Sequence, residues 1–350
     1  MTTRTWSRTR STAVAVVGAT ALLVSLTACD SGQEAPADAA GTSAAGDAGG
    51  SGPLEIVYLQ KQGDQQYFVD EADGAKAAAE AAGDVTVTVV NLGTDSNKAI
   101  SELDAAIARG VDGIIMVAPD QAIGPQVIEK ANAAGIPLLA SDDILTDADG
   151  NEAPFVGFDG TSMGNEVGTK AAELYQAAGW TAADTAIIAV GKPDLSVCVQ
   201  RLEGAADTFG QGASDAPEIL DLGTDNSVTD ALNKAGGLIT AHQDVQHWVV
   251  WGCNDESETG VVTALQNAGV SPDSIIGVGL GAYLTCKDWK AGQDTGNKAA
   301  LYISGYDVGS AALDAMVADL RDGTPLPPKT IAATHMVDAS NWEAEGVTCT

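Results

Sequence analysis

The chain has 350 residues, with 17 Lys and Arg against 48 Asp and Glu, and its formal net charge is −31 at pH 7. Nucleic acid and anionic membrane surfaces are therefore excluded as natural partners, because their phosphates repel a strongly acidic protein. The three histidines and five cysteines form no histidine cluster and no Cys-x-x-Cys pair. The sequence thus supports neither a metal site of nitrogen and sulfur ligands nor a cofactor.

The first segment has the pattern of an exported lipoprotein. Arg4, Arg8 and Arg10 precede the apolar run Ala13–Leu26, which is too short to remain as a membrane-spanning helix and is typical of a secretory signal peptide. Residues 26–29, Leu-Thr-Ala-Cys, resemble a bacterial lipobox, which predicts a signal peptide over residues 1–28 and lipidation of Cys29. The alternative is an ordinary signal peptide with an incidental cysteine. The lipoprotein interpretation predicts that the protein is exported and anchored to the outer face of the cell membrane.

A flexible linker is expected over residues 29–53, where Ala, Gly, Ser, Asp and Pro dominate. Such a composition cannot bury enough apolar surface to offset its chain entropy. Loss of residues 1–28 removes three basic residues and no acidic ones, so the net charge changes from −31 to −34. The body that follows has roughly 300 residues, a length that favours two domains.

Short apolar runs alternate with Ala-rich helical patterns twice along the body. Strands are expected over residues 54–59, 85–91, 113–117, 137–140 and 155–158, and then over 185–190, 218–222, 247–251 and 274–278. Helices are expected near residues 68–82, 97–108, 122–134, 162–178, 200–210, 227–241, 256–267 and 283–290. Continuous apolar strands between helices indicate parallel sheets covered on both faces. The predicted fold is therefore α/β, with two doubly wound parallel-sheet lobes.

Polar residues follow most of these strands, and ligands bind outside the carboxyl ends of strands in open α/β sheets. The first strand leads into QKQGDQQYF, which combines hydrogen-bonding side chains with aromatic rings and suits a polyhydroxylated ligand. Asp95, Asp120 and Asp225 are expected to be helix caps or turn residues. The residues that are harder to explain as caps are Lys61, Asp142, Asp143, Arg201 and Asn254.

Seven motifs, in this order, resemble those of the type I periplasmic sugar-binding proteins of ABC importers, most closely the L-arabinose-binding branch. They are KQGDQQYF, VDGIIMVAPDQAIG, GIPLLASDD, RLEGA, TDNSVTDALNKA, HWVVWGCNDES and SIIGVGLGA. The resemblance covers nearly the whole body and implies the type I periplasmic-binding-protein fold, in which three crossover strands join the lobes. It places residues 54–158 plus 304–327 in the N-terminal lobe, and residues 159–303 plus 328–350 in the C-terminal lobe.

The resemblance also implies a set of sugar-binding residues. They are Lys61, Gln65, Tyr67, Asp142, Asp143, Phe158, Arg201, Asn226 and Asn254. Asp143 matches the carboxylate that accepts from sugar hydroxyls, while Asp142 is expected to behave as a helix cap or an exposed neighbour. Gln65 and Tyr67 stand where the arabinose-binding pattern has a glutamate and a tryptophan, so the preferred epimer can differ.

Four cysteines remain after Cys29, and an even number in an exported protein suggests disulfides. Three pairings are possible on this count alone. In the implied architecture, Cys198 and Cys253 follow neighbouring strands of the second sheet. The resemblance therefore pairs these two and leaves Cys286 with Cys349.

The leading hypothesis is a monomeric, non-enzymatic receptor that delivers a pentose or related monosaccharide to an ABC permease and its ATPase. A sugar-sensing receptor for a chemotaxis or sensor-kinase partner would share the same site. A carbohydrate-acting enzyme is a weaker alternative, because the adjacent Asp142 and Asp143 are poorly placed to flank a scissile bond. The sequence also has neither a G-x-G-x-x-G motif after the first strand nor a P-loop.

Overall fold

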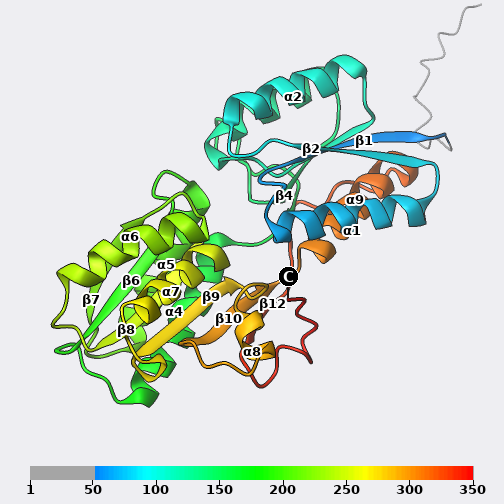
Figure 1. Cartoon of the computed structure of the whole chain (residues 1–350). Helices are drawn as coiled ribbons and strands as arrows, with labels where there is room; N and C mark the ends of the chain where they lie inside the picture. Colours follow the sequence, from blue (N-terminus) through cyan, green and yellow to red (C-terminus); the bar gives the residue numbers. More distant parts are fainter. Residues whose placement is uncertain (1–51, 350) are drawn as a thin grey trace, which may run out of the picture. The chain divides into compact units, whose positions relative to one another are not determined.

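The structure is a computed structural model that describes residues 52–349. The expected signal peptide, the lipidation site Cys29 and nearly all of the expected linker lie outside the described residues. All the described residues belong to a single unit of the chain, which contains two six-stranded sheets covered by helices (Figure 1). Within residues 52–349, no helix has the length and apolar character needed to cross a membrane.

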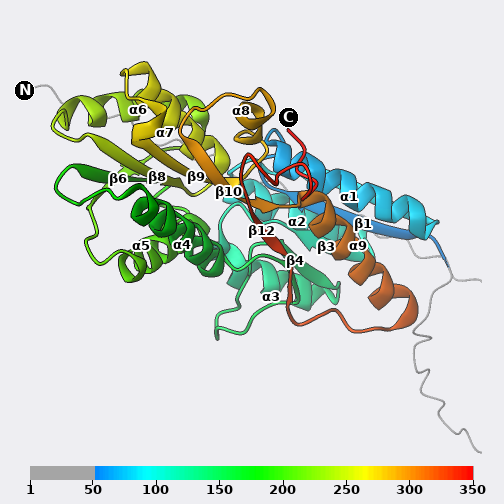
Figure 2. The ribbon, with the colours of Figure 1, turned by 90° about the horizontal axis from the view of Figure 1, so that it is seen from below.

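The first sheet has the strand order β11-β5-β4-β3-β1-β2, with parallel pairing throughout. Its strands are β1 (Leu54–Gln60), β2 (Val85–Asn91), β3 (Gly113–Met116), β4 (Leu138–Asp142), β5 (Phe155–Gly157) and β11 (Thr330–Ile331). Its helices are α1 (Gln66–Ala82), α2 (Ser96–Arg109), α3 (Gly124–Ala134) and α9 (Gly305–Asp322). Helices α2 and α3 cover one face, and α1 and α9 cover the other (Figures 1 and 2). Strand β1 is almost continuously apolar because both its faces are buried.

The second sheet has the strand order β12-β10-β9-β8-β6-β7, in which β12 is antiparallel to β10 and the other pairings are parallel. Its strands are β6 (Thr185–Gly191), β7 (Glu218–Gly223), β8 (His247–Gly252), β9 (Ile275–Gly281), β10 (Asn297–Ile303) and β12 (Thr334–Val337). Its helices are α4 (Gly160–Ala178), α5 (Ser196–Gly212), α6 (Val228–Ala241), α7 (Asp255–Asn267) and the short α8 (Cys286–Lys290). Helices α4 and α5 cover one face, while α6 and α7 cover the other. The predicted fold class is thereby confirmed.

The chain passes between the two sheets three times. Strand β5 leads into α4, β10 leads into α9, and β11 leads into β12. Thr330 and Ile331 pair with Val156 and Gly157 and thus belong to the first sheet, although the predicted boundary assigns residues 328–350 to the second lobe. The short β11 extends the parallel ladder before the chain changes sheets. The other lobe boundaries stay a prediction.

Three aspartates expected to serve as caps or turn residues have that role. Asp95 accepts hydrogen bonds from the backbone of Asn97 and Lys98 at the start of α2, and Asp225 accepts from the backbone N–H of Ser227. Asp120 caps a 3-10 turn over residues 121–123. It also accepts from Ser196 Oγ at 3.1 Å, which places it at the start of α5. Short acidic side chains satisfy helix N–H groups that otherwise have no partner.

Glycines bring two pairs of helices into close contact. A Cβ atom at Gly309 of α9 would overlap the carbonyl of Glu71 on α1, and one at Gly164 of α4 would overlap the carbonyl of Arg201 on α5. Residues with a side chain cannot approach a neighbouring backbone so closely. These contacts fix the positions of Glu71 and Arg201, which both lie at or beside the pocket described next.

Candidate functional site

One pocket is lined by residues from the carboxyl ends of strands in both sheets. Its lining residues are Lys61, Gln62, Gln65, Tyr67, Phe68, Asp142, Leu195, Val197, Arg201, Asn226, Cys253, Asn254, Leu280, Tyr283 and Ile303. Its volume is about 40 Å³, well below the roughly 300 Å³ at the lower end of small-molecule pockets. The space is small because side chains pair with one another within it. A ligand would have to replace some of those internal contacts.

Seven of the nine predicted site residues line this pocket, and two do not. The seven are Lys61, Gln65, Tyr67, Asp142, Arg201, Asn226 and Asn254. Asp143 and Phe158 line a neighbouring hollow instead, together with residues such as Gln121 and Ser196. Asp143 nevertheless belongs to the same group of charges, because it forms an ion pair with Lys61.

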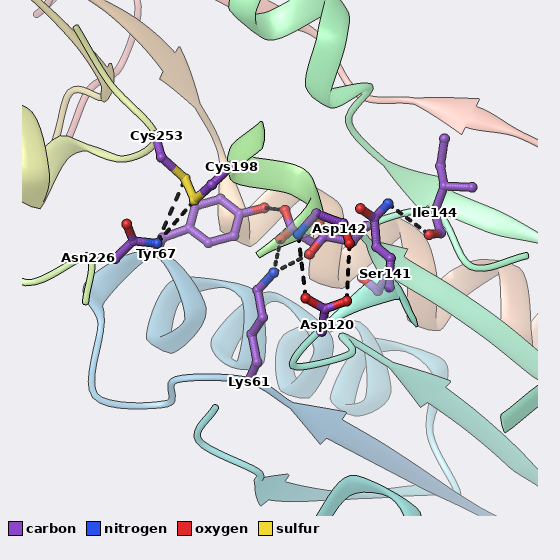
Figure 3. Close-up of polar contacts among 12 residues, drawn as sticks. Lys61, Tyr67, Asp120, Ser141, Asp142, Ile144, Cys198, Asn226 and Cys253 are labelled. Carbon is purple, nitrogen blue, oxygen red and sulfur yellow. Dashed lines mark hydrogen bonds and ion pairs between the residues drawn. A yellow bond between two sulfur atoms is a disulfide. The ribbon is translucent and has the colours of Figure 1, made fainter. Parts of the chain in front are cut away.

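Lys61 is bound by two carboxylates. Its Nζ donates a hydrogen bond to Asp143 and lies 3.7 Å from Asp142 Oδ2 (Figure 3). Lys61 is 4% exposed, and each aspartate is 3% exposed. Burial alone would lower the pKa of Lys61, but the carboxylates of Asp143 and Asp142 outweigh this and raise it. The ammonium group therefore stays charged and keeps a third hydrogen available for a ligand oxygen.

Asp142 is buried, so the expectation that it would be an exposed neighbour is wrong. It is the last residue of β4, where its backbone pairs with Gly157 of β5 and its φ is 64°. Its Oδ1 accepts a hydrogen bond of 2.9 Å from the hydroxyl of Tyr67 (Figure 3). Burial and the neighbouring Asp143 raise the pKa of Asp142, while Lys61 and Arg201 oppose this rise. Asp142 is the carboxylate that lines the pocket.

A buried carboxyl group lies directly behind Asp142 and Tyr67. Glu71 is fully buried, and its Oε1 accepts from the hydroxyl of Tyr58 at 2.6 Å and from Ser141 Oγ at 2.7 Å. Burial, followed by the charge of Asp142, raises the pKa of Glu71 to about 8. A protonated Glu71 adds no second negative charge behind the pocket at neutral pH. Sequence reasoning missed it because it reads as an ordinary helix residue.

The second lobe contributes one arginine and two asparagines. Arg201 donates to the carbonyl of Cys253 at 3.0 Å, and its Nε is buried without a hydrogen-bond partner. Asn254 caps α7 by accepting from the backbone N–H of Ser257 at 3.1 Å, so the expectation that a cap explains it poorly is wrong. The amide group of Asn254 also donates to the carbonyl of Asn226 at 3.0 Å. The unpartnered Arg201 Nε is thus a donor that the side chains of this lobe leave unused.

Two further residues on this side were not predicted: Tyr283, which lines the pocket, and Glu256, which contacts it. The hydroxyl of Tyr283 donates to Glu256, at 2.9 Å from Oε1 and 2.8 Å from Oε2. Glu256 also accepts from Asn254 Nδ2 at 2.8 Å, and thereby orients both Tyr283 and Asn254. Burial and the adjacent Asp255 raise the pKa of Glu256 to about 7. In the sequence, Glu256 is indistinguishable from an acidic residue that stabilises the first turn of a helix.

The four cysteines of the body form two disulfides, Cys198–Cys253 and Cys286–Cys349, which are the expected pairs. Their Cα–Cα distances are 5.0 Å and 5.7 Å. Both distances lie in the range that a disulfide requires. Only the first pair borders the pocket, through Cys253.

Chemically, the pocket offers paired donors and acceptors next to aromatic and aliphatic surface. In the described part of the chain, no group of three or more His, Cys, Asp or Glu residues is arranged to hold a metal ion. Two α/β lobes with three crossings and such a pocket at their strand ends define a two-lobed solute-binding protein. Residues 56–324 match the family described as periplasmic binding protein domain, and the chain belongs to that family. The resemblance to the type I sugar-binding proteins of ABC importers is confirmed.

Individual relatives agree with this assignment. The chain is 26% identical over 300 residues to an ABC transporter L-arabinose-binding periplasmic protein of Azospirillum brasilense, covering 83% of this chain and 88% of that protein. It is 25% identical over 293 residues to the L-arabinose-binding periplasmic protein of Escherichia coli, covering 81% and 87%. The crystal structure of a Caulobacter myo-inositol binding protein matches with a TM-score of 0.73 at 20% identity, covering 85% of this chain and 98% of that protein. This last likeness concerns the fold alone.

Proposed function

We propose that this protein is the substrate-binding component of an ABC sugar importer and binds a pentose or related monosaccharide, arabinose-like in its recognition. It acts as a monomer and without catalysis. The N-terminal lobe (residues 54–158 plus 304–327, together with the strand Thr330–Ile331) and the C-terminal lobe (residues 159–303 and the rest of the C-terminal segment) close on the ligand. The two L-arabinose-binding relatives support this choice of ligand class.

One observation carries the proposal: the pocket combines a doubly paired ammonium group with carboxylate, guanidinium and amide groups. A sugar hydroxyl donates one hydrogen bond and accepts two, so it needs partners of both kinds. Lys61 and Arg201 supply donors, Asp142 supplies acceptors, and Gln65 supplies both. A sugar epimer that leaves a buried donor or acceptor of the pocket without a partner loses about 1–3 kcal/mol of binding free energy. This penalty lets the pocket distinguish epimers.

The pocket also provides surfaces for the apolar side of the ligand. Tyr67 and Phe68 line it from α1, and their rings meet edge to face with centroids 5.0 Å apart. The C–H groups of a sugar ring can pack on such surfaces. Phe158 packs against Tyr67, with the two ring centroids 6.4 Å apart.

The proposed cellular setting follows from the N-terminal sequence. Residues 1–28 act as a signal peptide, Cys29 receives the lipid, and residues 29–53 form a tether from the outer face of the membrane. The loaded protein then reaches an ABC permease of the sugar-importer type, which is driven by its ATPase. Neither nucleic acid nor the anionic lipid surface takes part in recognition, because the protein is strongly acidic.

A thermal-shift screen followed by calorimetry tests the proposal. The soluble protein from residue 30 onward is mixed with L-arabinose, D-ribose, D-xylose, D-allose, myo-inositol and glycerol. Ligand at 100 times its Kd stabilises the folded protein by about 2.7 kcal/mol, which raises Tm by roughly 5 °C. We expect a pentose to give the largest shift. Absence of both a Tm shift and binding heat across the panel would refute the proposed function.

A further inference from the structure

The disulfide Cys198–Cys253 forms part of the wall of the proposed sugar pocket. Cys198 lies in the first turn of α5, and Cys253 lies in the loop between β8 and α7. Both are buried, and they form a small apolar cluster with Leu195 and Val197. Leu195, Val197 and Cys253 all line the pocket. The disulfide is therefore placed where its geometry determines the shape of the ligand site.

The disulfide also contacts Asn226, a polar residue of the same pocket. Asn226 Nδ2 lies 3.2 Å from Cys198 Sγ and 3.8 Å from Cys253 Sγ, so the amide group points at the bridge (Figure 3). The oxygen of the same amide group, Oδ1, accepts from Ser257 Oγ at 3.4 Å. Sulfur is a weak acceptor, so these contacts contribute more to orientation than to binding energy. The direction in which Asn226 presents its amide depends on the position of the two sulfur atoms.

A second pocket residue is tied to the same bridge. Arg201 lies three residues after Cys198, one turn further along α5, and its side chain donates to the carbonyl of Cys253 at 3.0 Å. Helix α5 is thus joined to the loop after β8 twice, once covalently and once through Arg201. Residues three apart share one face of a helix, so both links act on the same side of α5. Loss of the covalent link would free the guanidinium group to shift with the helix.

We infer that the Cys198–Cys253 disulfide is a positioning element of the ligand site, which holds Asn226 and Arg201 in place and thereby sets both affinity and ligand preference. This inference rests on the proposed function. It also makes binding sensitive to reduction. A dithiol such as dithiothreitol supplies two electrons and two protons, the S–S bond breaks, two thiols form, and the reductant closes to a cyclic disulfide. The two sulfur atoms then separate to van der Waals distance, which displaces the wall at Asn226.

The second disulfide provides a matched control within the same lobe. Cys286 and Cys349 pack with Ala282, Val337 and Trp342, and neither cysteine lines the pocket. The sequence separations of the two bridges are 55 and 63 residues. Loops of such similar length carry similar chain entropy. Removal of either bridge should therefore lower Tm comparably, while only the first should change ligand binding.

The test compares wild-type protein, Cys198→Ser/Cys253→Ser and Cys286→Ser/Cys349→Ser by calorimetry, with L-arabinose and any other sugar that the wild-type protein binds. We expect the first variant to bind at least tenfold more weakly and to change the order of preference among sugars. The second variant should bind within about twofold of wild type. Equal losses in both variants, or unchanged affinity and preference in the first, would overturn the inference.

A second measurement keeps the test decisive if Cys198→Ser/Cys253→Ser does not fold. Cys286→Ser/Cys349→Ser retains only the pocket disulfide, and dithiothreitol should lower its affinity at least tenfold, with recovery after reoxidation. Affinity that is unaffected by complete reduction, verified by thiol titration, would contradict the inference while leaving the proposed function intact. Failure of the oxidised wild-type protein to bind any sugar would instead refute the proposed function, and the inference with it.

Discussion

The replacement Lys61→Ala is expected to cost stability as well as binding. Lys61 pairs with Asp143, lies 3.7 Å from Asp142 Oδ2, and is 4% exposed. Its removal leaves two buried carboxylates without their cation. Removing one partner of a buried ion pair typically costs about 3–5 kcal/mol. With a urea m-value of about 3 kcal/mol/M, the unfolding midpoint should fall by about 1 M or more.

The pH dependence of this loss follows from the same charges. Burial already raises the pKa of Asp142 in the folded protein, and without the opposing charge of Lys61 this pKa rises further above its value in the unfolded chain. A raised folded-state pKa gives stability that is lost as the pH increases through it. The deficit of Lys61→Ala should therefore be larger at pH 8 than at pH 5. This comparison requires urea unfolding of apo protein at both pH values.

A double variant separates the stability effect from the loss of ligand contact. Lys61→Ala/Asp143→Asn removes one of the stranded charges and should recover part of the lost urea midpoint. Calorimetry should nevertheless show that neither variant binds the sugar that wild type binds, because the ammonium donor is absent from both. An apo Lys61→Ala protein that unfolds at the wild-type urea concentration at pH 8 would refute the argument. A double variant no more stable than the single one would do so too.

Two other predictions concern a buried acid and the membrane anchor. The pKa of Glu71 is raised to about 8, so the stability of the wild-type protein should decrease between about pH 4.5 and 8. The stability of Glu71→Gln should decrease less over this range. Identical urea midpoints of the two proteins at both pH 5 and pH 8.5 would contradict this. Cys29→Ala should abolish incorporation of a fatty-acid label and release the protein from the membrane fraction into the medium. Retention of the label would exclude Cys29 as the lipidation site.

Most of the fold could be predicted from the sequence because the central strands of both sheets are buried on both faces. Such strands appear as uninterrupted apolar runs, as in Leu54–Gln60 and Thr185–Gly191, and the helices between them impose parallel pairing. Three strands were not among those expected: Asn297–Ile303, Thr334–Val337 and Thr330–Ile331. The last is an exposed two-residue strand that belongs to the first sheet only through its pairing with β5. A segment that short has no periodicity from which its sheet could be predicted.

The sequence predicted those site residues whose positions follow from the convergence of strand ends. Lys61, Asp142 and Asn226 follow or end parallel strands, so topology alone brings them to the same edge of their sheets. The sequence assigned the ligand-binding carboxylate to Asp143 and expected Asp142 to be a helix cap or an exposed neighbour, whereas Asp142, with a φ of 64°, is buried and lines the pocket. Tyr283 was missed because its contribution depends on a hydrogen bond to Glu256, which no sequence pattern reveals.

The close approach of α4 to α5 gives the protein a way to alter selectivity from a distance. Gly164 abuts the carbonyl of Arg201, so even a single methyl group added there must displace α5, and the guanidinium with it. Two such proteins could share every residue around the sugar and still rank sugars differently, since the spacing of two helices, rather than the choice of any contacting side chain, would differ between them.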